Sequence, residues 1–378
     1  MGEIRVGVVG RRGEAFLAAL KAQRGIRLEA LCELNAAWLE EAARRWEVPL
    51  ATQIYEELLE RVDAVVLATP MHLHADQATR ALRADKHVLS EVTACVSMEE
   101  CWRLWRAART SRATYTMAEN YCNIPEVALV GELARRGFFG EPYYGEGEYL
   151  HEVRDYHHGA DGKPTWRAHW QVGTTGLTYP THSLGPVVQW MRTTDPRDRP
   201  ASVVALGSGI HTDPEHPHDD TSVALVKMAS GRLIRLRLDM MSNRPHLMAF
   251  YSLQGTAGAY EASRVEGQPG MVWFGESRAG ETRRWRSIGE FEEFLPDRYR
   301  NAPQEARHAG HGGGDWFLIE DWSATLRGEQ PPVVGVEDAL EWTSVGLLST
   351  LSVESGGVPL RIPDFRTGAG RPAWVDAL

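Results

Sequence analysis

The sequence predicts an α/β protein with two domains: an N-terminal doubly wound parallel sheet, and a C-terminal α+β domain whose open sheet is mainly antiparallel. Three observations lead to this prediction. The chain has 378 residues, which is too many for a single hydrophobic core. Short apolar strands alternate with helical segments in the first part of the chain, as is typical of parallel sheets. Later strands alternate apolar and polar residues and include a hairpin, as half-buried antiparallel strands do.

The elements of the first domain follow one another in a regular order. In such a sheet, ligands bind beyond the carboxyl ends of the strands. The residues that follow each strand are therefore candidates for a ligand-binding site. The expected strands are 4–9, 28–32, 63–69 and 87–90, with a last strand from 117 to 120, and the expected helices are 14–20, 39–43 and 76–82.

The first strand is followed by Gly10, Arg11, Arg12 and Gly13, and then by a helix. Glycines let the backbone approach a pyrophosphate, and the helix N-terminus binds its charge. Glu33 ends the second strand, where an acid binds the ribose 2′-OH of NAD and repels the 2′-phosphate of NADP. If Gly10 opens a G-x-G-x-x-G motif, Arg12 takes the second glycine position; if Gly13 ends it, the loop is shortened. We predict a dinucleotide-binding Rossmann domain at 1–119, the alternative being a domain that has lost its cofactor, with both arginines solvated.

Two further strand ends carry polar residues. Thr69, Pro70 and His74 follow one strand, and Glu91 follows the next. Because these carboxyl ends share one edge of the sheet, we expect the four residues to contribute to the cofactor site. His74 is equally compatible with a capping or surface role.

The second domain, expected at 120–378, contains the stretch with the strongest catalytic signal. Tyr179 and His182 come directly before an apolar run, and Pro186 suits the first turn of a helix. Both side chains are then expected at or just before a helix N-terminus, where the helix dipole disfavours an imidazolium. A neutral His182 near pH 7 is what a general base needs. The alternative is that both residues only cap a buried helix.

Around this stretch, strand-like and helical segments predict a sheet with one face covered by helices. Ser230 and Gly231 form a hairpin turn between two of the strands. The expected strands are 142–149, 221–227 and 232–239, and the expected helices are 127–137 and 336–354.

Composition excludes several classes of partner. The formal net charge is −10 and no basic stripe is visible, which argues against nucleic acid and anionic membranes. No apolar run approaches the roughly 20 residues of a membrane span, and the N-terminus leads straight into a strand, so we expect a cytoplasmic protein. The four cysteines form no CxxC pair, and the histidines at 157–158 and 216–218 match no standard metal spacing. We therefore expect no metal site.

Two strings in the first domain resemble the Gfo/Idh/MocA oxidoreductases, the relatives of glucose–fructose oxidoreductase and inositol dehydrogenase. They are Thr69-Pro70-x-x-x-His74 and the stretch from 85 to 91, which is similar to the family string G-K-H-V-x-x-E-K-P. Here Val92 and Thr93 replace the Lys-Pro pair. In the sugar dehydrogenases of the family that lysine assists proton transfer, so its replacement argues against their usual mechanism.

A subgroup that reads E-V-P is a closer match: the NAD-dependent glycosidases related to bacterial α-N-acetylgalactosaminidase. The resemblance implies NAD as cofactor, Asn120 as a cofactor residue, Glu148 and Tyr149 as substrate residues, and a homo-oligomer (dimer or tetramer) that uses the uncovered sheet face. The strings that resemble the subgroup are 99–102, 119–122, 137–141, 146–151, 177–182, 254–258 and 310–315.

Two loops are further candidates for the substrate site. Residues 154–170 are rich in His, Gly and Trp, and Trp166 with Arg167 could line a sugar site because aromatic faces stack on pyranose C–H surfaces. His311 lies in the glycine-rich stretch 310–315, whose glycines allow close approach to a ligand. His311 is a candidate neighbour of substrate or nicotinamide, the alternative being a flexible loop with an Asp cap.

Together these residues predict an NAD-dependent oxidoreductase that acts on a pyranose or a sugar derivative by hydride transfer. His182 is the expected base, and Tyr179, whose phenol titrates near 10 when free, the expected donor or relay. The alternative is a redox-neutral NAD-dependent glycosidase, with transient oxidation at C3 and elimination at C1. A further alternative is a non-catalytic protein that binds a nucleotide or a sugar.

Overall fold

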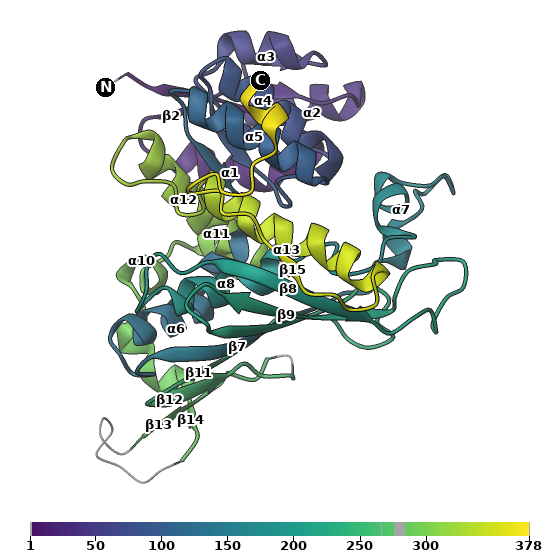
Figure 1. The fold of residues 1–378 in the computed structure, drawn as a ribbon. Helices are drawn as coiled ribbons and strands as arrows, with labels where there is room; N and C mark the ends of the chain where they lie inside the picture. Colours follow the sequence, from purple (N-terminus) through teal and green to yellow (C-terminus); the bar gives the residue numbers. More distant parts are fainter. Residues whose placement is uncertain (1, 266, 276–283, 378) are drawn as a thin grey trace. The chain divides into compact units, whose positions relative to one another are not determined.

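The computed structural model describes residues 2–265, 267–275 and 284–377, and Figure 1 traces the chain through two compact units. The first unit comprises Met1–Asn123, Pro303–Thr343 and Asp364–Leu378, and the second comprises Ile124–Ala302 and Ser344–Pro363. This division differs from the single boundary expected at 119/120, because two later segments return to the first unit.

The first unit is built on a parallel sheet with the order β3-β2-β1-β4-β5-β6 among its described residues (Figure 1). The chain extends the sheet in both directions from β1, which confirms the predicted doubly wound Rossmann sheet. The short strand β3 was not predicted, and the last strand ends before Asn120, which begins a 3₁₀ turn. The strands are β1 Ile4–Val9, β2 Ile26–Cys32, β3 Leu50–Thr52, β4 Ala64–Leu67, β5 His87–Ser90 and β6 Tyr115–Met117.

Helices follow the strands of this sheet, and side chains cap several of them. Asn35 accepts a hydrogen bond from the Trp38 N–H, and Ser97 accepts one from the Glu100 N–H. The elements are η1 Arg11–Gly13, α1 Glu14–Ala22, α2 Ala36–Trp46, α3 Tyr55–Arg61, η2 Met71–Leu73, α4 His74–Arg83, α5 Met98–Thr110 and η3 Asn120–Asn123. The returning segments add α11 Gln304–Arg307, η6 His311–Gly313, α12 Gly314–Leu326, the first part of α13 Val336–Glu354, and η7 Ala373–Ala377.

One hydrophobic core explains why the returning segment belongs to the first unit. Phe16 and Leu20 on α1 are buried in the same cluster as Ile319 and Trp322 on α12. Val8 on β1 completes the contact from the sheet. Burying these large side chains stabilises the association of α12 with α1 by about 1.5–3 kcal/mol for each residue.

The second unit contains a nine-stranded sheet among its described residues, in the order β14-β13-β12-β11-β7-β10-β9-β8-β15 (Figure 1). Only β7 and β10 pair in parallel within that sheet, so the predicted mainly antiparallel sheet is confirmed. The strands are β7 Pro142–Leu150, β8 Pro200–Gly207, β9 Thr221–Met228, β10 Leu233–Asp239, β11 Leu247–Gly255, β12 Gly258–Glu261, β13 Met271–Phe274, β14 Arg286–Ser287 and β15 Leu360–Arg361. Its helices are α6 Pro125–Arg135, η4 Arg154–Tyr156, α7 Trp166–Gln171, α8 Thr181–Met191, η5 Ile288–Phe294, α10 Asp297–Arg300 and the rest of α13.

Helix α8 packs against one face of β7, and the contact requires glycine. A Cβ on Gly147 would lie 1.9 Å from the Ser183 carbonyl oxygen, and one on Gly145 would lie 2.5 Å from Val187 Cγ1. Since side chains alternate along a strand, Tyr149 shares the α8 face with these glycines.

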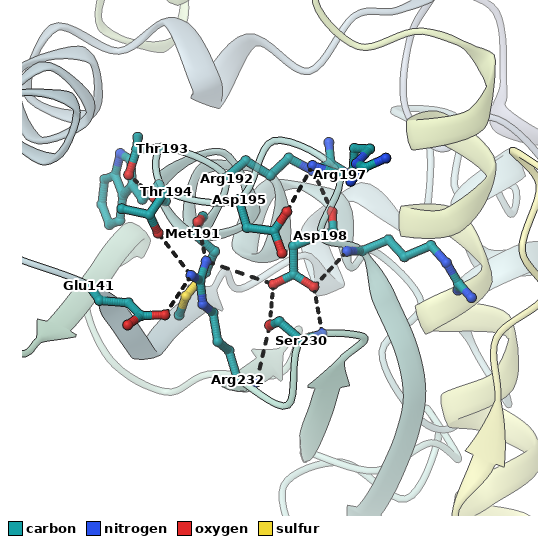
Figure 2. A network of polar contacts seen from close by, with 12 residues as sticks. Glu141, Met191, Arg192, Thr193, Thr194, Asp195, Arg197, Asp198, Ser230 and Arg232 are labelled. Carbon is teal, nitrogen blue, oxygen red and sulfur yellow. Dashed lines mark hydrogen bonds and ion pairs between the residues drawn. The ribbon is translucent and has the colours of Figure 1, made fainter.

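A buried polar network fixes the C-terminal end of α8 (Figure 2). Arg232 donates to the Met191 carbonyl, which ends the helix, and to Thr194 Oγ1 at 2.8 Å. Asp198 accepts from the Ser230 N–H at 2.9 Å and from its hydroxyl at 2.6 Å. Because Ser230 forms the turn between β9 and β10, the network ties the helix to that end of the sheet. In the described ranges, no helix is both long and apolar enough to cross a membrane.

Candidate functional site

In the turn after β1, the backbone conformation and the close packing require glycine at two positions. Gly10 has φ 93°, and a Cβ there would lie 2.4 Å from the Ala68 carbonyl oxygen. A Cβ on Gly13 would lie 2.3 Å from Val8 Cγ1. Gly10 therefore forms the tight turn, and Gly13 permits the close packing of helix on strand that the last glycine of the motif provides. The geometry favours the shortened loop, with Arg11 and Arg12 between the two glycines.

Glu33 is held in a defined orientation at the end of β2. Its carboxylate accepts from the Arg11 N–H at 2.8 Å and from the Asn35 N–H at 3.0 Å. These bonds place an acid next to the glycine turn, where a ribose hydroxyl donates in nucleotide-binding domains of this kind.

His74 contacts two backbone carbonyls, and its role at the cofactor site stays a prediction. Its Nδ1 lies 2.8 Å from the Thr93 carbonyl oxygen and its Nε2 lies 2.8 Å from that of Thr69. Burial lowers the pKa of His74, although the two carbonyls favour the protonated form. The ring thus lies between the chain after β4 and the chain after β5, and the single N–H of the neutral imidazole donates to one of the two carbonyls. Among the neighbouring predicted residues, the Thr69 hydroxyl donates to Gln77 at 2.7 Å, and Pro70 precedes η2.

A buried carboxylate gathers several predicted cofactor residues within the first unit. Asn120 Nδ2 donates to Asp315 Oδ1 at 2.6 Å, and His311 Nδ1 lies 3.0 Å from the same oxygen. The Arg12 guanidinium lies 3.3 Å from Asp315 Oδ2 and 3.4 Å from Glu91 Oε1. Sequence reasoning missed Asp315 as a functional residue, although it closes the glycine-rich stretch that was singled out.

Opposing effects set the charge of that carboxylate. Burial raises the pKa of Asp315, but the hydrogen bond and charge of His311, the charge of Arg12 and the hydrogen bond of Asn120 together hold it below its usual value. Asp315 is therefore ionised at neutral pH.

Glycines allow the loop from 310 to 314 to fold closely around this carboxylate. A Cβ on Gly310 would lie 2.3 Å from Asp315 Oδ2, and a Cβ on Gly314 would lie 2.4 Å from the Asn120 carbonyl oxygen. His311 itself has φ 55°, a left-handed conformation that costs a non-glycine residue about 1–2 kcal/mol.

The residues at this edge fit a dinucleotide. Asn120 Oδ1 is buried and has no hydrogen-bond partner among the described residues. Such an acceptor suits a donor of the cofactor, because a buried unpaired oxygen costs about 1–3 kcal/mol. Glu33 offers a fixed carboxylate to a ribose, and Arg12 offers a cation.

In the second unit, the structure brings Tyr179 and His182 together as predicted. Their rings lie 5.0 Å apart and meet edge to face at 79°. The ring of Tyr149 lies 5.7 Å from that of Tyr179 and 5.5 Å from that of His182. His182 is the second residue of α8 and is only 3% exposed, so its ring is shielded from bulk water.

The expected position of Pro186 is corrected, because α8 begins at Thr181 and Pro186 lies inside the helix. Proline has no N–H to donate to the carbonyl four residues before it, which belongs to His182. The hydroxyl of Tyr251, on β11, donates to that carbonyl at 2.6 Å instead. The helix thus keeps its first turn, which carries the predicted base.

Further polar rings extend this cluster. His151 lies 5.6 Å ring to ring from Tyr149, and its Nδ1 lies 3.0 Å from His246 Nδ1. Burial, with the charges of His246 and Arg167, lowers the pKa of His151 to about 4. His151 was not among the predicted site residues, though it stands two residues after Tyr149, directly beyond the end of β7.

The segment expected as a loop contains helix α7, which carries Trp166 and Arg167. The Arg167 guanidinium lies 4.7 Å from the Trp166 ring and 6.0 Å from the Tyr156 ring. Its charge reaches His151, so Arg167 belongs to the electrostatic surroundings of the aromatic cluster.

Glu148 does not belong to this cluster, and its substrate role stays a prediction. It is buried on the opposite face of β7, 3.0 Å from Arg264 and 3.4 Å from Arg235. Alternation along the strand turns it away from Tyr149 and α8. Elsewhere in the second unit, His157 lies 4.8 Å ring to ring from His216, but no three metal-ligating side chains among the described residues are arranged to hold a metal ion.

Two family models match the chain. Residues 4–119 match "Oxidoreductase family, NAD-binding Rossmann fold", and residues 125–374 match "Glycosyl hydrolase 109, C-terminal domain". A glycosyl hydrolase family 109 protein of Shewanella pealeana is 29% identical over 413 residues, covering 99% of this chain and 89% of the relative. One from Shewanella amazonensis is 30% identical over 407 residues, covering 99% and 88%.

Solved structures of similar fold include dehydrogenases. Levoglucosan dehydrogenase in complex with NADH and L-sorbose has a TM-score of 0.77 at 18% identity, covering 96% of this chain and 100% of that one. An NAD-binding oxidoreductase from Klebsiella pneumoniae has a TM-score of 0.78 at 20% identity, covering 96% and 99%. At this identity, the likeness establishes the fold.

Proposed function

This chain belongs to glycosyl hydrolase family 109 within the Gfo/Idh/MocA oxidoreductases, and from that premise we propose that it is an NAD-dependent enzyme that oxidises a ring carbon of a sugar, with His182 as general base. The observation that carries the proposal is the contact of Tyr179 and His182 at the start of α8, beside Tyr149. The family match confirms the resemblance found in the sequence, and with it NAD as cofactor.

The residues of the first unit that we assign to the cofactor act as follows. Glu33 accepts from a ribose hydroxyl, Arg12 neutralises negative charge near the glycine turn, and Asn120 Oδ1 accepts a hydrogen bond. Bound NAD supplies the hydride acceptor.

The residues of the second unit bind the sugar and move its proton. His182 takes the proton of the hydroxyl that is oxidised, and positioned acid–base groups of this kind contribute about 10²–10⁴-fold in rate. Tyr179 donates to or relays protons from the imidazole. The faces of Tyr149 and Trp166 suit the C–H surface of a pyranose. Val92 is buried and apolar, so it cannot replace the lysine of the sugar dehydrogenases.

The second candidate is a redox-neutral glycosidase, and the name of the matched C-terminal family favours it. Oxidation at C3 acidifies the neighbouring C2–H, whose removal expels the C1 substituent. Addition of water and return of the hydride then complete a hydrolysis without net redox change. The same residues serve both reactions.

A panel of aryl glycosides and free sugars, each incubated with NAD⁺, separates the two candidates. Release of the aryl alcohol without net NADH supports the glycosidase, and a rise in absorbance from NADH with a free sugar supports the dehydrogenase. If the protein binds NAD⁺ but turns over neither set, the enzymatic proposal fails, and a non-catalytic binding protein is left.

The assembly that we propose is a homo-oligomer, dimer or tetramer, formed through the sheet face of the second unit opposite α8. Leu206 on β8 and Leu225 on β9 are 62% and 42% exposed on this face. A Leu225→Asp variant should dissociate in sedimentation velocity, and an unchanged sedimentation coefficient argues against this interface. The described cysteines are all free and buried, which supports a reducing, cytoplasmic location.

A further inference from the structure

We infer that Asp315 is a positioning residue that fixes Asn120, His311 and Arg12 in the orientations that the cofactor needs. The inference rests on the proposed use of NAD by the first unit. Asp315 is 1% exposed and lies in the first turn of α12. Its two carboxylate oxygens make different contacts: Oδ1 faces Asn120 and His311, and Oδ2 faces Arg12.

The first consequence concerns the amide of Asn120. An ionised carboxylate only accepts hydrogen bonds, so the amide must turn its NH₂ group toward Asp315. Its Oδ1 then points away, and it is the buried atom with no partner among the described residues. Asp315 therefore determines that Asn120 offers an acceptor to the ligand. If the carboxylate were neutral or absent, the amide could flip and offer a donor.

The second consequence concerns the tautomer of His311. Its Nδ1 lies 3.0 Å from both Asn120 Nδ2 and Asp315 Oδ1, and it cannot accept from the first and donate to the second at once. Donation from Nδ1 to the charged carboxylate is favoured, because a hydrogen bond to an ionised acceptor is about twice as strong as a neutral one. Nδ1 thus carries a proton and donates it to Asp315 Oδ1. The same bond also offsets the left-handed backbone of His311.

The third consequence concerns the cation of the glycine turn. Arg12 lies between two carboxylates, Asp315 and Glu91, and its guanidinium also lies 5.3 Å from the ring of Phe16. A long side chain held from three directions loses less entropy when it meets an anion.

The contacts of Asp315 join parts of the chain that lie far apart in sequence. Asn120 is 195 residues away and Arg12 is 303 residues away. The packing of α12 against α1 and η3 brings the carboxylate to this edge of the sheet. The cofactor edge therefore depends on a residue outside the stretch that matches the NAD-binding family model.

The test compares two ligands on Asp315→Asn by isothermal titration. NAD⁺ involves all of the residues that Asp315 positions, whereas adenosine has no phosphate for Arg12 and probes the half that we assign to Glu33. We expect the Kd for NAD⁺ to rise about tenfold or more, since charged hydrogen bonds are lost. The Kd for adenosine should stay within about twofold, because Asp315 does not contact Glu33.

Asp63→Asn is the matched control. Asp63 is also a carboxylate paired with an arginine of the first unit, at 2.7 Å from Arg5, but it precedes β4 and so lies at the amino edge of the sheet. This variant should leave both affinities unchanged. Equal losses of NAD⁺ and adenosine affinity in Asp315→Asn, or no loss, overturn the inference. A wild-type chain that binds no NAD⁺ contradicts the proposed cofactor site instead.

An exchange of the two side chains gives a second, charge-conserving test. Asn120→Asp alone puts two carboxylates together and should weaken NAD⁺ binding strongly. Combining Asn120→Asp with Asp315→Asn restores one amide and one carboxylate, with the net charge of the wild type. We expect the exchanged variant to bind NAD⁺ several-fold more tightly than Asn120→Asp. If it binds no better, the pairing does not position the amide.

Discussion

Tyr251→Phe removes a single hydroxyl group that substitutes for a missing backbone donor. The hydroxyl donates at 2.6 Å to the His182 carbonyl, which Pro186 cannot satisfy. Tyr251 is buried, so water does not readily replace the lost donor. The substitution therefore removes a buried donor from the carbonyl in the turn that carries the proposed base.

The expected cost follows from the burial of that acceptor. A buried polar group that loses its partner costs about 1–3 kcal/mol, so we expect the free energy of unfolding to fall by about 2 kcal/mol. The first turn of α8 also loses a constraint on its position. Misplacement of a catalytic group by about 1 Å can cost about 100-fold. We expect kcat to fall by about tenfold and the Kd for NAD⁺ to stay unchanged.

Urea unfolding measures the loss of stability, and steady-state kinetics measure the loss of kcat. Pro186→Ala tests whether the missing N–H of Pro186 is the reason that the hydroxyl is needed. Alanine at 186 restores an N–H that can donate to the His182 carbonyl. In that background, Tyr251→Phe should cost about 1 kcal/mol less than in the wild type. Tyr143→Phe, which removes an exposed hydroxyl from the same unit, is the control and should change neither quantity.

Two results would refute this reasoning. One is a Tyr251→Phe variant as stable as the wild type. The other is the same cost with and without Pro186, which would mean that the hydroxyl does not replace the missing N–H.

The remaining predictions test single residues. His182→Ala should lower turnover by at least about 100-fold with NAD⁺ affinity unchanged, and near-normal turnover would remove this residue from the mechanism. Glu33→Ala should weaken NAD⁺ binding and relax discrimination against NADP⁺, whereas an unchanged preference for NAD⁺ in titration contradicts its assignment. Asp198→Ala should lower the free energy of unfolding by about 3 kcal/mol in urea, because it removes the buried carboxylate beside the cation of Arg232 and leaves only the exposed Glu141, and a variant of unchanged stability contradicts that role. The pKa of His151 is lowered from 6.5 to about 4, so the unfolded chain binds its proton more readily and the folded state loses stability as pH falls from about 7 toward 4. His151→Phe should therefore lose less stability than the wild type between pH 7 and pH 5. Equal losses of unfolding free energy in the two proteins contradict the lowered pKa of His151.

The order of elements was predictable because it depends on local patterns. Apolar runs, alternating strands and a Ser-Gly turn are visible in any short window, and the class of each sheet follows from them, although β3, β8 and β11 to β15 were not expected. Tyr179 and His182 were predictable for the same reason, since three positions separate them along the chain. The place of Pro186 was misjudged because the start of a helix depends on its surroundings, here on the hydroxyl that Tyr251 supplies from β11.

The contacts that span the chain were not predictable from local patterns. Nothing near Asn120 indicates that its amide meets Asp315, because that contact forms only when α12 packs on α1. Glu148 is a different case. Strand alternation already separates Glu148 from Tyr149, and a period of two along that strand predicts that the two side chains lie on opposite faces.

Each candidate site contains an oxygen atom that lacks a hydrogen-bond donor from its own element. Whether another part of the protein supplies that donor distinguishes a structural oxygen from one that binds a ligand. At His182, the missing donor is replaced from within the unit by the Tyr251 hydroxyl, so that oxygen is satisfied and structural. At Asn120, Asp315 binds the N–H side of the amide and leaves Oδ1 buried without a partner among the described residues. Folding alone does not favour an unpaired buried acceptor, since it lowers stability. A ligand that donates to it recovers that cost, which is why we assign Asn120 to the cofactor.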